Sequence, residues 1–132
     1  MNETLPVCRL SLPVSGWSVR VGRGADGRPA LEVYNDFRLA DVSVTTSLSV
    51  AFLRGAVRSR RGRPPWALGW GQLAPGSADP TIVFSGRDGC RQVAAEVVEG
   101  SYWVAEASGE FSDVTIAVGP THTTGRLRRA PY

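Results

Sequence analysis

Hydrophobic and polar residues alternate along much of this chain with the period of two residues that is typical of β-strands. The longest alternating stretch covers residues 42–53. Its even-numbered positions are the apolar or β-branched residues Val42, Val44, Thr46, Leu48, Val50 and Phe52. Because successive side chains of a strand point to opposite faces, we expect these positions to face the core. The pattern therefore predicts one long strand over residues 42–53.

Shorter stretches predict further strands. Residues 17–21, 31–34 and 114–118 alternate in the same way, and residues 81–84 form a short apolar run. In residues 66–71, Trp66, Leu68 and Trp70 are expected on one face, and Ala67, Gly69 and Gly71 on the other. Residues 91–99 include the good helix formers Ala94, Ala95 and Glu96, but they have no clear N-cap and end in two valines. We interpret them as a strand, with a short helix as the alternative.

Turn signals separate these runs. Asp26-Gly27, Asp88-Gly89 and Glu99-Gly100 are dipeptides that favour hairpins, and nine prolines and fifteen glycines are spread along the chain. This pattern predicts an all-β fold, namely a single antiparallel β-sandwich of about eight to nine strands, immunoglobulin-like or jelly-roll-like, with a small β-barrel as the alternative. The Cys–Trp–Cys spacing of immunoglobulin domains is absent. The length of 132 residues is that of one domain, so we expect residues 1–132 to fold as one.

The hairpin around Glu99-Gly100 determines where Trp103 points. A two-residue turn would place Trp103 opposite Glu96, on the face that carries Ala94, Val98 and Ala105. That face is the more polar of the two, so we expect Trp103 to be exposed or to contact a partner. A register shift of one residue would reverse this orientation.

The charge distribution is uneven. All fifteen basic residues are arginines, which fits either codon usage in a GC-rich genome or selection for the bidentate guanidinium group, and the net charge is +3. Residues 42–78 contain no acidic residue, and the C-terminal residues are again basic. The arginines of these two regions are Arg54, Arg58, Arg60, Arg61, Arg63, Arg126, Arg128 and Arg129. One positive pole on an otherwise acidic chain would orient the protein in the field of a polyanion.

Residues 58–65, with the sequence Arg-Ser-Arg-Arg-Gly-Arg-Pro-Pro, are expected to form a connecting loop because proline lacks the N–H donor of a central strand. The loop could neutralise phosphates, with Trp66 behind it as a stacking surface. Alternatively, it is a solvated loop that keeps a strand edge from aggregating. We predict that these arginines contribute to partner binding and little to folding.

Residues that could support catalysis are few. His122, in the segment Thr-His-Thr-Thr that we interpret as a loop, is the one histidine. Cys90 with His122 would be a possible dyad, and Glu96, Glu99, Glu106 and Glu110 could supply a pair of carboxylates. No phosphate-binding glycine loop and no zinc-ligand spacing occur. We therefore expect a protein that is not an enzyme, without metal or cofactor; the alternative is a small hydrolase or lyase with a site at a barrel mouth.

The function that we predict is a non-catalytic binding or assembly module, possibly a subunit of a larger assembly. The partner would be another protein or a second copy of the chain, with a nucleic acid as the alternative. The contacts would come from an arginine-rich loop and a sheet face that carries aromatic residues. The candidate residues are Arg54, Arg58, Arg60, Arg61, Arg63, Trp66, Trp103, Arg126, Arg128 and Arg129.

Two features concern the compartment. The chain shows no signal peptide and no run of apolar residues long enough to span a membrane, so we expect a cytoplasmic protein. Cys8 and Cys90 are far apart in the sequence and are expected to be free thiols.

Overall fold

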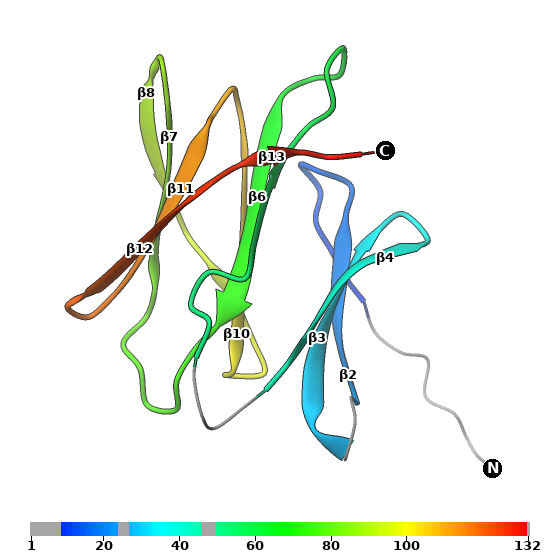
Figure 1. Ribbon diagram of the computed structural model, residues 1–132, viewed down its shortest axis with the longest axis vertical. Coiled ribbons are helices and arrows are strands. Elements are labelled where there is room, and N and C mark those ends of the chain that lie inside the picture. Colours follow the sequence, from blue (N-terminus) through cyan, green and yellow to red (C-terminus); the bar gives the residue numbers. More distant parts are fainter. Residues whose placement is uncertain (1–8, 24–26, 46–49, 132) are drawn as a thin grey trace.

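The computed structural model describes residues 9–23, 27–45 and 50–131. The secondary-structure elements of these residues are all strands, and the strands belong to three sheets (Figure 1). The prediction of an all-β fold is confirmed.

The N-terminal sheet has the strand order β1-β2-β3-β4 and is antiparallel throughout. Its strands are β1 (Leu10–Ser11), β2 (Ser18–Arg23), β3 (Pro29–Asn35) and β4 (Arg38–Val44). The expected alternation is present in β2 and β3, where Val19, Leu31 and Val33 are fully buried. The register between β3 and β4 shifts between Val33 and Tyr34.

The middle sheet has the order β13-β5-β6-β10-β9. Its strands are β5 (Gly55–Arg58), β6 (Trp66–Gln72), β9 (Glu96–Val98), β10 (Tyr102–Ser108) and β13 (Arg128–Arg129). All pairs are antiparallel except β13 with β5, which is parallel. The C-terminal strand β13 therefore lies beside a strand from the middle of the chain.

The C-terminal sheet has the order β12-β11-β7-β8 and is antiparallel. Its strands are β7 (Thr81–Gly86), β8 (Gly89–Val93), β11 (Asp113–Val118) and β12 (Thr121–Arg126). Val114, Ile116 and Val118 of β11 point inward, as their alternation predicts. The segment that contains His122 is part of β12, so its interpretation as a loop is wrong. The threonines that favour strands pair with β11 across a tight turn at Gly119-Pro120.

The three sheets pack as layers, with the middle sheet between the other two (Figure 1). One hydrophobic cluster lies between the N-terminal and middle sheets and includes Trp17, Leu31, Leu68 and Tyr102. A second lies between the middle and C-terminal sheets and includes Phe84, Trp103 and Ile116. The sandwich architecture is confirmed, but the strand count is too low: the described residues form thirteen strands, because β1, β5, β12 and β13 are too short or too polar to produce a clear hydrophobic pattern.

The prediction for residues 42–53 is wrong in its extent and in its inward face. Strand β4 ends at Val44, residues 50–54 are not in a strand, and residues 46–49 lie outside the described residues. Ser43 is buried, whereas Val44 is 36% exposed. The physical reason is that the odd-numbered residues face polar side chains of the middle sheet. Gln72 Nε2 donates to Ser43 Oγ (2.8 Å), and the Thr45 and Tyr102 hydroxyls bond each other.

Strand β6 confirms the faces predicted for residues 66–71. Trp66, Leu68 and Trp70 contact the cluster on the N-terminal side, and Ala67 belongs to the cluster on the other side. Both faces of β6 are buried because the strand lies in the middle layer. Gly69 and Gly71 leave room there for the indole ring of Trp103.

The hairpin between β9 and β10 differs from its predicted register by one residue. Its turn contains three residues, and Trp103 pairs with Val97 instead of Glu96. Trp103 consequently points into the second cluster, is fully buried, and donates from Nε1 to the Phe52 carbonyl (2.6 Å). The prediction that Trp103 is exposed is wrong, because both faces of β10 are covered by other sheets.

The remaining predictions on local structure have mixed outcomes. Residues 91–93 are the end of β8 and residues 96–98 are β9, so the prediction of strand over helix is confirmed, but the single predicted strand is two strands in different sheets. The turn at Asp88-Gly89 is present, with Gly86 paired to Gly89. Asp26 of the first predicted turn and Cys8 lie outside the described residues. Cys90 is a free, exposed thiol.

Candidate functional site

The two basic segments of the sequence lie side by side. Strand β13 pairs with β5, which places Arg128 opposite Val57 and Arg129 opposite Arg58. Two hydrogen bonds continue this pairing. Ala130 N donates to the Arg58 carbonyl (2.8 Å), and Arg129 Nη1 donates to the Ser59 carbonyl (3.0 Å). Arginines separated by about seventy residues in the chain are therefore concentrated at one edge of the middle sheet.

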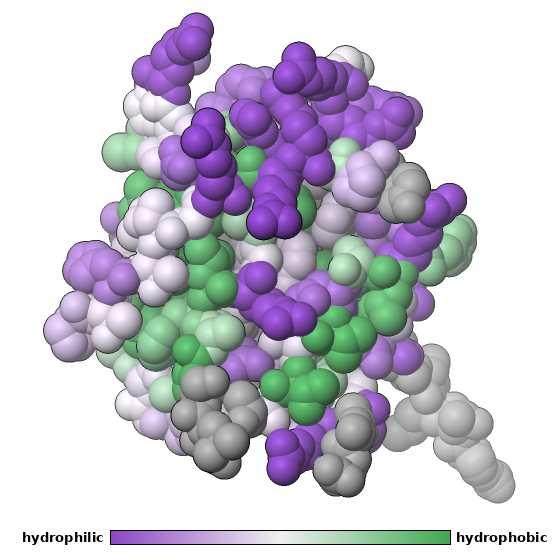
Figure 2. All heavy atoms as spheres, in the orientation of Figure 1, coloured by the Kyte–Doolittle hydropathy of each residue, from purple (hydrophilic) through white to green (hydrophobic). Residues whose placement is uncertain are grey.

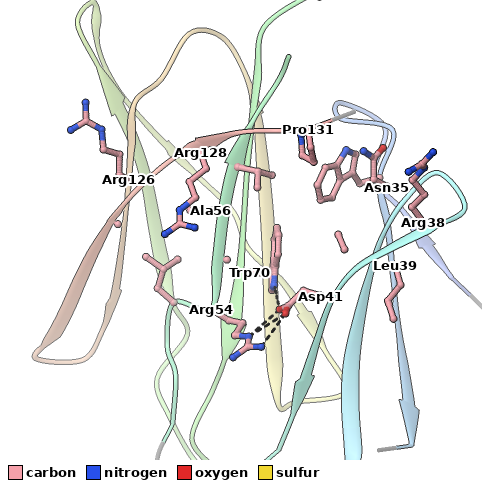
Figure 3. Close-up of a pocket in the computed structure, with 16 residues that line it drawn as sticks. Asn35, Arg38, Leu39, Asp41, Arg54, Ala56, Trp70, Arg126, Arg128 and Pro131 are labelled. Carbon is pink, nitrogen blue, oxygen red and sulfur yellow. Dashed lines mark hydrogen bonds and ion pairs between the residues drawn. The ribbon is translucent and has the colours of Figure 1, made fainter. Parts of the chain in front are cut away.

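A groove of about 620 Å³ runs between this edge and strand β4 of the N-terminal sheet (Figure 3). Apolar groups supply much of its lining, and arginines and Asp41 surround them. The lining residues used below are Arg38, Leu39, Asp41, Leu53, Arg54, Ala56, Trp70, Arg126, Arg128 and Pro131. An extended ligand in this groove would contact both a charged rim and an apolar floor.

Asp41 links the two walls of the groove. Its carboxylate accepts hydrogen bonds from Arg54 Nη2 (3.0 Å) and from Trp70 Nε1 (2.9 Å), as Figure 3 shows. The hydrogen bond to Asp41 and the attraction between the charges raise the pKa of Arg54, although burial acts in the opposite direction. Arg54 is thus fixed in direction and partly neutralised.

Two arginines of the C-terminal segment border the same groove. Arg126 and Arg128 are exposed, and neither forms an ion pair with any residue in the described parts of the chain. Arg128 points toward the part of the groove where Arg54 lies, whereas Arg126 points away from it (Figure 3). Arg128 therefore offers an uncompensated guanidinium group to a ligand.

A second cavity, of about 300 Å³, continues the groove toward the loop between β5 and β6. Trp17 and Asn35 line both cavities, so the two are adjacent. The second cavity is also lined by Arg60, Arg63 and Trp66. We call the two cavities with their arginines, Arg38, Arg54, Arg60, Arg63, Arg126 and Arg128, the arginine track. In the view of Figure 2, hydrophilic residues gather over the upper part of the molecule, where Figure 1 has β13 and the loop between β5 and β6.

The prediction that residues 58–65 form a connecting loop is confirmed for residues 59–65. Residues 59–65 are not in a strand, and Arg60, Arg61 and Arg63 are exposed. The base of the loop is closed by bonds between Ser59 and Trp66, including one from Trp66 N to Ser59 Oγ (3.1 Å). The tip can therefore present its arginines without disturbing the sheet.

Arg58 and Arg129 differ from the other candidates. Arg58 lies in β5, so the loop begins one residue later than predicted, and Arg129 lies in β13. Both side chains are half-buried, and the Nε atom of each is buried without a hydrogen-bond partner. Neither residue lines the two cavities described above, and Arg58 instead lines a separate cavity beside the β7–β8 turn.

The four tryptophans do not form an exposed platform. Trp103 is fully buried, and Trp17 and Trp70 are each 4% exposed. Trp66 is half-buried and packs edge-on against Trp17, with ring centroids 5.8 Å apart. Of the two aromatic residues proposed from the sequence, Trp66 alone borders the arginine track.

The residues considered for catalysis are dispersed. Cys90 and His122 lie on β8 and β12, the opposite edges of a four-stranded sheet, so they cannot form a dyad. Glu106 accepts hydrogen bonds from the backbone N–H groups of Val14 and Ser15 (2.8 Å each), which anchors the first turn. Glu96, Glu99 and Glu110 are exposed. Within the described ranges, no three His, Cys, Asp or Glu residues gather in a way that could hold a metal ion.

Two residues of the site had no clear signal in the sequence. Asp41 and Leu39 belong to β4, whose facing direction depends on its contacts with the middle sheet. Near them, Phe37 is 86% exposed at the tip of the β3–β4 hairpin, and Asp36 beside it has a positive φ of 59°. The pair Asn35-Asp36 before Phe37 is a turn signal in the sequence that could have placed Phe37 at a hairpin tip.

Comparisons with known proteins give no family for this chain. Neither protein-family models, nor curated proteins, nor solved structures gave a match. The described residues contain no helix that is long and apolar enough to cross a membrane.

Proposed function

We propose that this protein is a non-catalytic binding or assembly module that contacts a macromolecular partner through the arginine track. The observation that carries the proposal is the pairing of β13 with β5, which joins two basic segments that are far apart in the sequence. Concentrating like charges at one edge is electrostatically unfavourable, and an anionic partner would compensate for it.

The shape of the track supports binding over simple solubility. Arginines that only solubilise a protein are expected to be dispersed over a convex surface. Here Arg54 and Arg128 border a groove with an apolar floor, and Arg60 and Arg63 border its continuation. Arginine and apolar side chains together are typical of protein interfaces.

A second candidate function is nucleic-acid binding. It is favoured by Trp66, which is half-buried beside Arg60 and Arg63 and whose accessible part could stack on a base. A module that binds an acidic protein should prefer an acidic polypeptide, whereas a nucleic-acid-binding protein should prefer an oligonucleotide.

The proposal can be tested with two fluorescent probes, a 20-residue poly-L-glutamate and a 20-nucleotide oligo-dT, measured by anisotropy at low and rising salt. The variants are R126S/R128S in the tail and R60S/R61S/R63S in the loop. Because an exposed charge contact contributes about 0.2–1 kcal/mol, the tail variant should bind the preferred probe roughly two- to thirty-fold more weakly.

The control is R28S/R87S, which removes the same charge as the tail variant from exposed positions outside the track. It should keep most of the affinity. If neither probe binds, or if the control loses as much affinity as the tail variant, the arginine track is not a binding site and the proposal is wrong.

A further inference from the structure

We infer that the groove between β4 and β5 binds an extended acidic segment of a partner protein that carries apolar side chains among its carboxylates. This inference rests on the proposed function and names the class of partner.

Apolar side chains in the groove remain accessible. Leu39 is 53% exposed, and Leu53 and Ala56 are partly buried against the second hydrophobic cluster. All three line the groove together with Pro131. Covering this surface removes apolar area from water, which favours a ligand with an apolar side chain over one that carries only charge.

Two cations border the groove on the side of β5 and β13, across from Leu39 of β4 (Figure 3). Arg128 has no ion pair among the described residues and points into the groove region near Arg54. Arg54 is oriented by Asp41 but is still 45% exposed at its side chain. A guanidinium group binds a carboxylate through two parallel hydrogen bonds, and Arg128 suits such a contact. Nε and Nη2 of Arg54 already donate to Asp41, so Arg54 adds its positive charge and its remaining Nη1 group.

A nucleic acid fits this groove less well. Single-stranded nucleic acids are bound by stacking their bases on exposed aromatic rings. The tryptophans that line the groove, Trp17 and Trp70, are 4% exposed, and the Nε1 group of Trp70 is already bonded to Asp41. The lining therefore offers no stacking surface.

A second copy of the chain also fits poorly. In a two-fold symmetric dimer the same patch meets itself, so Arg54 and Arg128 of one copy would face those of the other. Like charges opposed across an interface oppose association. A partner of opposite charge avoids this repulsion.

The backbone of β4 gives little support for adding a strand. The carbonyl groups of Val42 and Val44 point away from β3, but Arg54 Nη2 (3.3 Å) and Gln72 Nε2 (3.0 Å) already donate to them. Recognition in the groove must therefore depend on side chains of the partner more than on main-chain pairing.

Two acetylated and amidated octapeptides test the inference, Glu-Glu-Leu-Glu-Glu-Leu-Glu-Glu and the same sequence with glycine in place of leucine. Each is titrated into ¹⁵N-labelled protein, with oligo-dT of eight nucleotides as a third probe. We expect the leucine peptide to shift the amide signals of Leu39, Gly55 and Gly125, and to bind at least about threefold more tightly than the glycine peptide.

The variant L39S should remove this preference for leucine, since it removes the exposed apolar group from the groove. The matched control is V97S, which changes an apolar residue that is 44% exposed on β9, outside the groove. V97S should keep the preference. Both side chains are exposed, so both variants are expected to fold.

The possible outcomes separate this inference from the proposed function. Equal binding of the two peptides, shifts confined to the loop 59–65, or stronger binding of oligo-dT in the groove would overturn the inference while leaving a polyanion-binding module. Self-association that shifts the same groove signals without peptide would also overturn it. If no probe binds at all, the proposed function fails as well.

Discussion

At the scale of single residues, the middle sheet depends on positions that have no side chain. Gly71 of β6 faces the Phe52 carbonyl, and a Cβ atom there would overlap that carbonyl and lie 2.7 Å from Trp103 Nε1. At Gly69, two residues earlier on the same face, a Cβ atom would lie 3.2 Å from the Trp103 ring. The two glycines accommodate one tryptophan with different amounts of free space.

This difference predicts the order of two substitutions. Gly71→Ala should lower the free energy of unfolding by more than Gly69→Ala, and by about 3 kcal/mol or more, because overpacked cores cost roughly 1–3 kcal/mol even where neighbours can adjust. Backbone carbonyls adjust less easily than ring edges. Urea unfolding monitored by tryptophan fluorescence measures both values; a smaller loss for Gly71→Ala would contradict the packing of Trp103.

A second residue-scale feature is the polar network on the outer face of the N-terminal sheet. Glu32 forms an ion pair with Arg20 and accepts a hydrogen bond from the Tyr34 hydroxyl (2.7 Å). Burial acts to raise the pKa of Glu32, but the bonds from Arg20 and Tyr34 outweigh it, so that this pKa is lowered. The bond to Glu32 also raises the pKa of Tyr34.

The lowered pKa of Glu32 predicts a pH dependence. Its contribution to stability is present above the unfolded-state pKa of about 4.5 and is lost as the pH falls through the lower folded-state value. The stability difference between the wild type and Glu32→Gln should therefore be largest near neutral pH and shrink below about pH 4.5. Thermal unfolding between pH 7 and pH 3 measures it. A difference that stays constant over this range would show that the ionised carboxylate is not what stabilises the network.

At the scale of elements, strand β4 is attached to the middle sheet by polar groups. Asp41, Ser43 and Thr45 face inward, and each forms a side-chain hydrogen bond with the middle sheet. Asp41 pairs with Trp70, Ser43 with Gln72, and Thr45 with Tyr102. Buried polar groups must be paired, so each bond constrains how far β4 can slide along the middle sheet. These contacts place Leu39 and Asp41 in the groove wall.

Asp41→Asn tests the link between this strand and binding. Asparagine can still accept the hydrogen bond from Trp70, but Arg54 loses its counter-charge. The free energy of unfolding should fall by roughly 0.5–2 kcal/mol, and the affinity for poly-L-glutamate should rise because the groove gains an uncompensated cation.

The control for Asp41→Asn is Asp79→Asn, which removes one charge at an exposed position outside the groove. It should change neither stability nor affinity appreciably. An equal rise in affinity for the two variants would mean that net charge, and not the release of Arg54, controls binding. Calorimetry and anisotropy provide the two measurements.

At the scale of the whole molecule, the middle sheet supports both outer sheets. Strands β6 and β10 are buried on both faces, which leaves the edge strands of the layers to form the exposed boundary. The groove occurs at this boundary, where β4 of one layer approaches β5 and β13 of the next. A site at the edge of stacked sheets can be long and open without weakening either hydrophobic cluster.

The sequence by itself determined the local features of this protein. Alternation over residues 17–21, 31–34 and 114–118 correctly predicted strands and their inward faces, because the period of two is a property of a single strand. Prolines and arginines likewise predicted the loop at residues 59–65, and the turn dipeptides predicted two hairpins. Each of these features depends on neighbours in the chain.

The tertiary structure alone decided which strands are buried on both faces and which distant segments of the chain lie side by side. Trp103 is buried because the C-terminal sheet covers a face of β10 that looked polar in the hairpin. Ser43 points inward because Gln72 of another sheet is there to bond it. Arg128 reaches the groove because β13 pairs with β5. Such pairings depend on contacts between segments far apart in the chain, and the hydrophobic period within one segment carries no information about them.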